Sequence, residues 1–349
     1  MADLVTSDLP RDPPGAPATD AFLAPATPED AERLADRLAR VRDAVATVIV
    51  GQATVVDEAL VTVLARGHAL LEGVPGTAKT LLVRALAGAL GARFGRVQFT
   101  PDLMPADVTG VSVLRDDGAG GRRFEFVPGP VFTDLLLGDE INRAPAKTQA
   151  ALLEAMAERQ VTVDGRSRPL GDAFTVFATQ NPVEFEGTYP LPEAQLDRFL
   201  LKIRVDYPDA EAERTILDRY AGGFDAERAA DASPAPVLDA ADRVALRTAV
   251  DRVTVAPEVR AYVVALVRAT REEASLTLGG SPRATVALFR AARAAALLDG
   301  RAFATPDDVK AYAPAVLRHR VVLAPELEVE QRTPDDVLAA ILDRVPAPK

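Results

Sequence analysis

The chain contains no cysteine, so it can form neither a disulfide bond nor a thiolate metal site. Its two histidines, His68 and His319, are too few for most histidine-based metal sites. It also lacks any apolar run of the roughly eighteen residues that a membrane-spanning helix needs, and its amino terminus lacks the apolar core of a signal peptide. We therefore expect a cytoplasmic protein with no membrane span.

The length and net charge of the chain indicate the number of domains and the kinds of partner to expect. The chain has 349 residues, more than one hydrophobic core usually organises, so two domains are expected. With 48% apolar and 26% charged residues, most of the chain can fold. The net charge of −11 disfavours a broad nucleic-acid-binding surface, although one local basic groove would not show in this sum.

The stretch 72–80, Glu-Gly-Val-Pro-Gly-Thr-Ala-Lys-Thr, organises the rest of the chain. The apolar run 68–71 leads into it, and Leu82 and Leu86 lead out of it at helical spacing. This order of strand, loop and helix is typical of a phosphate-binding loop, in which the free amide groups at the helix start bind polyphosphate. The alternative is an ordinary turn before an amphipathic helix.

Lys79 and Thr80 carry the chemistry expected of such a loop. Lys79 falls in the first helical turn, where a cation opposes the helix dipole unless an anion is present, and it can reach terminal phosphates. The hydroxyl of Thr80 can bind the accompanying Mg²⁺. Ala78 departs from the general pattern, which has glycine before the lysine. The candidate nucleotide-binding residues are Gly73, Val74, Pro75, Gly76, Thr77, Ala78, Lys79 and Thr80, together with Gly51 and Gln52.

The remaining pattern predicts a Pro-rich disordered tail over residues 1–28, an α/β domain over 29–207 and an all-helical domain over 208–349. Hairpins are expected within 101–127 and 160–170, with a plain surface loop as the alternative for the first. Strands are expected at 68–71, 96–100, 135–140, 174–179 and 200–205. Helices alternate with these strands, which predicts three layers around a parallel sheet. The later helices are expected at 210–220, 239–253, 257–273, 282–298, 306–317 and 334–345, several of them starting with Ser-Pro or Thr-Pro.

Three polar residues follow predicted buried strands. Asp139 and Glu140 end an uninterrupted apolar run, and Asn181 ends the next strand along the chain. The carboxyl ends of parallel strands open on the ligand crevice, so Asp139 could hold Mg²⁺, Glu140 could activate a water, and Asn181 could orient that water. Each residue alone could equally be a cap for the following helix.

Five motifs together resemble the MoxR family of AAA+ ATPases. They are Gly-Val-Pro-Gly-Thr-Ala-Lys-Thr (73–80), Asp-Glu-Ile-Asn-Arg-Ala (139–144), Leu-Leu-Glu-Ala-Met (152–156), Ala-Thr-Gln-Asn-Pro (178–182) and Leu-Pro-Glu-Ala-Gln-Leu-Asp-Arg-Phe (191–199). The likeness runs from about residue 50 to the carboxyl terminus. That family also has alanine at the position of Ala78, whereas it commonly has alanine where this chain has Gly138.

The resemblance implies a role for each site residue. Lys79 and Thr80 would form Walker A, Asp139 and Glu140 Walker B, and Asn181 sensor 1. Arg198 would be an arginine finger that reaches the nucleotide of a neighbouring subunit, and Arg283 would be sensor 2, projecting from the helical lid toward the γ-phosphate. Residues 101–127 would be the helix-2 insert, and 160–170 the hairpin before sensor 1.

Plain alternatives exist for both arginines. Arg283 falls in the first turn of its helix, which favours a docked anion, but it could simply extend into solvent. Arg198 could form a surface ion pair, for example with Asp197.

The family also implies a homo-oligomeric ring, by analogy a hexamer, that couples Mg-ATP hydrolysis to chaperone-like remodelling of partners bearing von Willebrand factor A domains. One alternative is a magnesium-chelatase-like motor subunit of the same branch. A nucleic-acid or transcription-associated motor is disfavoured by the net charge. A catalytically silent scaffold is disfavoured because Glu140, Asn181 and Arg198 are all present.

Overall fold

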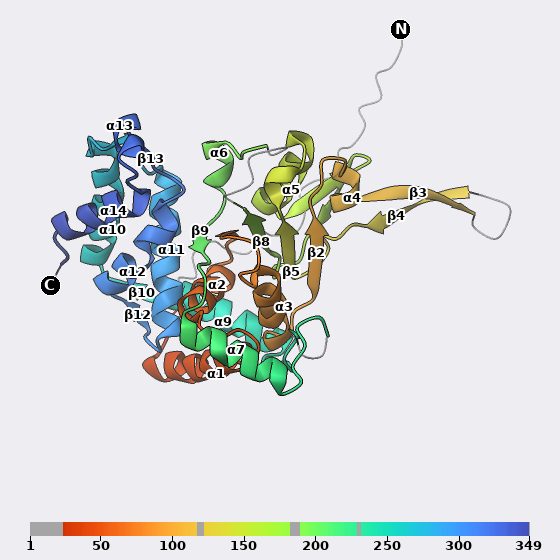
Figure 1. The fold of residues 1–349 in the computed structure, drawn as a ribbon, viewed down its shortest axis with the longest axis horizontal. Coiled ribbons are helices and arrows are strands. Elements are labelled where there is room, and N and C mark those ends of the chain that lie inside the picture. The colour runs from red at the N-terminus through yellow and green to blue at the C-terminus, as the bar shows by residue number, and fades with distance from the viewer. Residues whose placement is uncertain (1–23, 117–121, 182–188, 229–231, 349) are drawn as a thin grey trace, which may run out of the picture.

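The computed structural model describes residues 24–116, 122–181, 189–228 and 232–348, and its centre is a sheet of five parallel strands (Figure 1). The strand order is β2-β5-β8-β1-β9, and each neighbouring pair is parallel. These are the five strands predicted from the apolar runs, and the α/β fold with a parallel sheet is confirmed. Their bounds are β1 Ala69–Glu72, β2 Phe94–Gln98, β5 Leu135–Asp139, β8 Thr175–Gln180 and β9 Leu201–Arg204.

The central strands are apolar on both faces because helices cover both faces of the sheet. Leu135 and Leu137 belong to one buried cluster, whereas Leu136 between them belongs to the other. On the first side lie α1 (Pro28–Ala46), α2 (Ala53–Leu64) and α3 (Lys79–Ala89). On the second side lie α4 (Pro105–Thr109) and α5 (Ala146–Glu158). This gives the predicted three layers.

Two antiparallel hairpins leave the sheet region, as the alternating runs predicted. Strands β3 (Gly110–Asp116) and β4 (Arg122–Pro128) form an arm that projects away from the body, and its connection at 117–121 is outside the described residues (Figure 1). Strands β6 (Gln160–Val163) and β7 (Arg166–Pro169) form the shorter hairpin. The Arg168 guanidinium lies 3.8 Å from the centre of the Phe126 ring, so the two hairpins are joined at the base of the arm.

The first helix, α1, begins at Pro28, and the predicted tail over residues 1–28 is too long. The Thr27 hydroxyl accepts a hydrogen bond from the Asp30 amide at 3.1 Å. Just before it, the Ala26 amide donates to the Arg252 carbonyl, and Arg252 Nε donates to the Ala24 carbonyl at 2.6 Å. The segment 24–27 is therefore docked on the end of α9 (Ala240–Arg252), and the rest of the predicted tail, residues 1–23, is outside the described residues.

Beyond β9 the described chain is mainly helical, and each helix predicted there is present. The bounds are α6 Glu193–Leu196 before β9, then α7 Ala210–Ala221, α9 Ala240–Arg252, α10 Pro257–Glu272, α11 Pro282–Leu298, α12 Pro306–Leu317, α13 Pro325–Val329 and α14 Pro334–Arg344. None of the helices within the described ranges is both long and apolar enough to cross a membrane.

The expectation of a purely helical second part was wrong in one detail. Strand β10 (Thr254–Val255) pairs with β12 (Phe303–Ala304), and β11 (Leu276–Leu278) pairs with β13 (Val322–Leu323). Strands of two or three residues are too short to give a period-2 signal in the sequence. The second part also shares one buried apolar cluster with α1, α2 and α3, so it packs directly on the first side of the sheet.

His68, one of the two histidines, is buried beside the start of β1. Its Nδ1 accepts a hydrogen bond from the Val176 amide at 2.9 Å, and its Nε2 lies 3.2 Å from the Met156 carbonyl, to which it donates. Because the ring is buried away from water, its pKa is lowered to about 3. The folded protein therefore holds a neutral imidazole that ties β8 and α5 to β1.

We predict that the free energy of unfolding falls as the pH falls below about 6.5. Unfolded His68 binds a proton in this range, whereas folded His68, with a pKa of about 3, does not. Each pH unit is worth about 1.4 kcal/mol for this residue. His68→Asn removes the titrating group, so urea unfolding should show the gap between parent and variant narrowing by about 2 kcal/mol from pH ~6.5 to pH ~5. A gap that does not change with pH would contradict a neutral buried His68.

Candidate nucleotide site

The loop 73–78 leaves the carboxyl end of β1 and enters α3, and its backbone needs small residues. A Cβ on Gly73 would lie 2.2 Å from the Val205 carbonyl oxygen, so no other residue fits there. Ala78 has φ of 61°, in the left-handed region. This conformation explains why the general loop pattern has glycine at that position, and alanine adopts it at a cost of roughly 1–2 kcal/mol.

Lys79 lies across the loop at the start of α3. Its Nζ donates to the carbonyls of Gly73 and Val74, each at 2.7 Å. Partial burial lowers the pKa of Lys79, while the nearby carboxylates of Asp139 and Glu140 oppose this shift. The ammonium group is thus held at the mouth of the loop, beside the two acids that the sequence predicted there.

Asp139 and Glu140 converge on this loop from the end of β5. Asp139 Oδ2 lies 3.5 Å from Thr80 Oγ1, which brings the two predicted metal-binding oxygens together. Glu140 has φ of 58°, a strained conformation that residues at functional sites often hold. The Thr179 hydroxyl joins the two acids, because it donates to Asp139 Oδ1 at 2.7 Å and accepts from the Glu140 amide at 2.8 Å.

Further side chains donate hydrogen bonds to the carboxylates of Asp139 and Glu140. The sequence analysis identified neither these side chains nor Thr179. Arg96 donates to Asp139 Oδ2 at 2.8 Å, and Gln98 donates to Glu140 Oε2 at 2.9 Å. Arg143 donates to the same Glu140 oxygen at 3.0 Å. The polar residues that alternate along β2 were the available signal, because Gln98 is in register with Asp139 in the neighbouring strand.

Asn181 lies at the same edge of the sheet. It directly follows β8, in which Gln180 is in register with Glu72, so Asn181 comes next to the start of the loop at Gly73. The residue as a whole is 8% exposed, so it is buried in the protein rather than placed in a solvated helix cap. The structure therefore brings together Lys79, Thr80, Asp139, Glu140 and Asn181.

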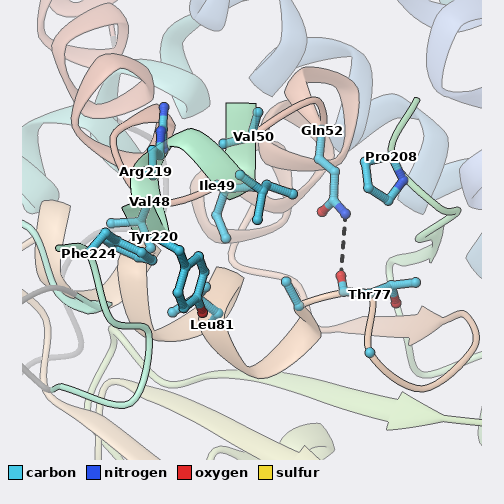
Figure 2. A pocket seen from close by; sticks show the side chains of 13 residues that line it. Val48, Ile49, Val50, Gln52, Thr77, Leu81, Pro208, Arg219, Tyr220 and Phe224 are labelled. Atoms are coloured by element: carbon cyan, nitrogen blue, oxygen red, sulfur yellow. Dashed lines mark hydrogen bonds between the residues drawn. The ribbon is translucent and has the colours of Figure 1, made fainter. Parts of the chain in front are cut away.

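An apolar cavity of about 190 Å³ adjoins the loop (Figure 2). Its walls come from the segment 48–50, from Leu81 of α3 and from Tyr220 of α7, with Phe224 nearby. Gln52 lines the cavity and donates to the Thr77 carbonyl at 3.3 Å, which is the dashed contact in Figure 2. Gly51, predicted together with Gln52, lies instead on the wall of a second cavity that faces Arg204 and Arg318.

Arg198 and Arg283 lie elsewhere, in a groove of about 580 Å³. Gly67 and His68, which precede β1, line this groove, whereas the phosphate loop follows β1. The four-residue strand between them is about 13 Å long. The phosphate loop and Arg283 of one chain therefore lie at opposite ends of β1, because α11 places this arginine beside Arg198 at the amino ends of β1 and β9. The role of Arg283 toward a γ-phosphate stays a prediction.

The groove is strongly basic, and this local positive charge does not show in the negative net charge of the whole chain. Its lining includes the two predicted arginines and four more, Arg66, Arg159, Arg290 and Arg320. Arg198 is exposed and donates to the Leu153 carbonyl at 2.8 Å. The suggested ion pair between Arg198 and Asp197 is absent from the contacts of the described residues, where Asp197 pairs with Arg320 and lies 4.0 Å from Arg283.

Together, the parallel sheet, the glycine loop before α3 and the acids at the end of β5 define a P-loop ATPase with a helical lid. The family model described as "ATPase family associated with various cellular activities (AAA)" matches residues 68–201, and the model described as "AAA lid domain" matches residues 268–341. A crystal structure from Cytophaga hutchinsonii, provisionally described as an ATPase, superposes with a TM-score of 0.83 at 39% identity, covering 92% of this chain and 98% of that one.

Curated relatives narrow the class to a family. The chain is 43% identical to "Chaperone MoxR1" of Mycobacterium tuberculosis, over 97% of this chain and 89% of that protein. It is 36% identical to "Protein MoxR" of Methylorubrum extorquens, over 90% of this chain and 96% of that protein. It is also 46% identical to the Bacillus subtilis protein YeaC, over 86% of this chain and 92% of that protein. The chain belongs to the MoxR family of AAA+ ATPases.

The hydroxyl of Thr179 offers a test of the acid network. Thr179→Val keeps the shape of this buried side chain but leaves the Glu140 amide without its acceptor, so we predict a loss of about 1–3 kcal/mol in urea unfolding. Thr175→Val in the same strand is the matched control, since the buried Thr175 hydroxyl makes one long contact to the Ala173 carbonyl at 3.3 Å. Equal losses in the two variants would contradict a special role for Thr179.

Proposed function

We propose that this ATPase hydrolyses ATP at the interface between adjacent copies of the chain and uses the cycle to remodel partner proteins. The observation that carries the proposal is the separation of its two sets of polar residues. Lys79, Asp139 and Glu140 lie at the carboxyl ends of the strands, whereas Arg198 and Arg283 share a groove at the amino ends. One chain therefore has both halves of a site but cannot bring them together.

The loop and the adjoining cavity provide the nucleotide-binding half. The amide groups at the start of α3 and the Lys79 ammonium would bind the phosphates. The base would enter the apolar cavity, where Gln52 and the Thr77 backbone offer polar groups at one side and Tyr220 offers an aromatic face (Figure 2). Residues 73–80 with Gln52 form this half.

The donor set next to the loop fits Mg²⁺. The Thr80 hydroxyl and the Asp139 carboxylate are oxygen donors 3.5 Å apart, and hard cations of this kind prefer oxygen ligands. Thr80 and Asp139 would hold the ion, which neutralises phosphate charge when it is bound. Arg96 shares the Asp139 oxygen and would turn away when the carboxylate takes this role.

Glu140 and Asn181 would act on the attacking water. Glu140 would accept its proton or orient it, and Asn181 would hold it from the neighbouring strand. Gln98 and Arg143 engage the same Glu140 oxygen, so Glu140 must exchange these partners for the water. Arg198 and Arg283 of the adjacent copy would stabilise the negative charge that develops on the γ-phosphate.

We infer the oligomeric assembly and the remodelling role from the family to which the chain belongs. A repeated head-to-tail contact between the two half-sites gives a ring when the rotation closes, and we propose a closed hexameric ring in the cytoplasm. A relative in Mycobacterium tuberculosis is named a chaperone, which supports a remodelling role. A von Willebrand factor A domain protein is the proposed partner. The projecting arm exposes Phe124 and Leu114, which are 77% and 51% accessible, and so offers apolar contact surface away from the nucleotide site.

Glu140→Gln separates nucleotide binding from hydrolysis. The amide keeps the shape of the side chain but cannot accept a proton, so we predict that turnover falls by about 10²–10⁴-fold while Mg-ATP affinity stays near that of the parent. Calorimetry and phosphate release would measure the two quantities. Normal turnover in this variant would refute the role of Glu140.

Arg198→Ala tests whether the arginine acts on a neighbour. We predict retained ATP binding and a rate reduced by about 10³-fold or more. Adding excess Lys79→Ala subunits, which cannot bind nucleotide but keep Arg198, should restore part of the phosphate release. An Arg198→Ala protein that hydrolyses normally, or that Lys79→Ala subunits cannot rescue, would contradict action across the interface.

A further inference from the structure

Arg320, which follows α12 in the lid, is buried and binds the segment that carries Arg198. Its Nε donates to Asp197 Oδ1 at 2.7 Å, and its Nη1 donates to the Leu200 carbonyl at 3.1 Å. Its Nη2 donates to the carbonyls of Asp197, at 3.2 Å, and Phe199. One guanidinium group therefore fixes the chain on both sides of Arg198.

Asp197 connects the same guanidinium to the start of α11. The Ser281 hydroxyl, which caps this helix, donates to Asp197 Oδ2 at 3.0 Å. Arg283, two residues further on, lies 4.0 Å from the same oxygen. Asp197 therefore links Arg320 to Arg283 and the start of α11, and its own backbone leads directly into Arg198.

The two residues before Arg320 extend this attachment along β9. His319 Nε2 lies 3.0 Å from the Phe199 carbonyl, and Arg318 Nη1 donates to the Lys202 carbonyl at 3.1 Å. Residues 318–320, which we call the lid clamp, therefore bind the backbone from 197 to 202. These hydrogen bonds attach the segment that carries Arg198 to the lid.

We propose that Arg320 is a positioning residue for hydrolysis at the neighbouring subunit, because it holds Arg198 and Arg283 in a fixed relation to each other. This inference rests on the proposed function across the interface. Arg320 lines the inner wall of the groove and is buried, whereas Arg198 and Arg283 are exposed on its rim. It acts through these two arginines rather than on the nucleotide.

The shape and charge of the guanidinium group explain why position 320 of the lid clamp needs an arginine. The planar guanidinium serves a carboxylate and several carbonyls at once, which an ammonium or apolar group cannot do. Without Arg320, the partly buried Asp197 carboxylate keeps Arg283 as its nearest cation, 4.0 Å away. Arg283 would then close on Asp197 and be drawn away from the phosphate of the neighbour, while the segment 197–200 would lose its hold on Arg198.

The test uses Arg320→Met, Arg320→Lys and Arg198→Ala in the full-length chain. Arg320→Met should bind Mg-ATP in calorimetry as the parent does, and kcat should fall by about tenfold to 100-fold, since small displacements of positioned groups have effects of this size. KM should change little, and Arg320→Lys should recover part of kcat. Excess Lys79→Ala subunits should rescue Arg320→Met, because they offer correctly placed arginines to its nucleotide sites.

The lid control is Arg301→Met. Arg301 pairs with Asp308 at 2.6 Å within the lid and touches neither arginine of the groove, so loss of lid stability alone would appear in this variant too. If Arg320→Met has the kcat of the parent protein while Arg198→Ala is inactive, this inference is overturned and the proposed function remains supported. Loss of kcat in Arg320→Met that Lys79→Ala subunits fail to rescue would also overturn it. Parental activity in Arg198→Ala would instead defeat the proposed function.

Discussion

The common direction of the five strands is the constraint on which the site depends. Since the strands are parallel and in register, the loop after β1, Asp139 after β5 and Asn181 after β8 must meet at one edge of the sheet. Hydrogen bonds across the strands then set the finer geometry, because Thr179 joins Asp139 to the Glu140 backbone. No single residue creates this arrangement, and a shift in the register of the strands would move the site residues apart.

The same strand direction places Arg198 on the opposite side. It precedes β9, so it lies where the strands begin, and the lid packs there through Arg320 and the start of α11. The phosphate loop and the basic groove thus lie at opposite ends of the strands of one chain. The proposed completion of the site by an adjacent copy rests on this separation, and under that proposal nucleotide at one interface would contact the lid of the adjacent copy.

Much of this could be predicted from the sequence, since it depends on local signals. The short strand-like runs predicted the five strands, the Ser-Pro and Thr-Pro pairs marked the starts of several later helices, and the glycine loop predicted the position of Lys79. What could not be predicted depends on contacts between distant segments. Arg320 and Asp197 are separated by 123 positions, and the register of Gln98 with Asp139 exists only once the sheet forms. The position of Arg283 beside Arg198 could not be predicted for the same reason, because the packing of the lid decides it.

The most direct measurement is the ATPase rate per subunit as a function of protein concentration, with the assembly state followed in parallel by light scattering. If an arginine from the next copy completes the site, the rate per subunit rises with concentration, from near zero in the monomer to a plateau in the assembled protein. A rate per subunit that stays constant down to dilutions at which only monomers are present would contradict the account.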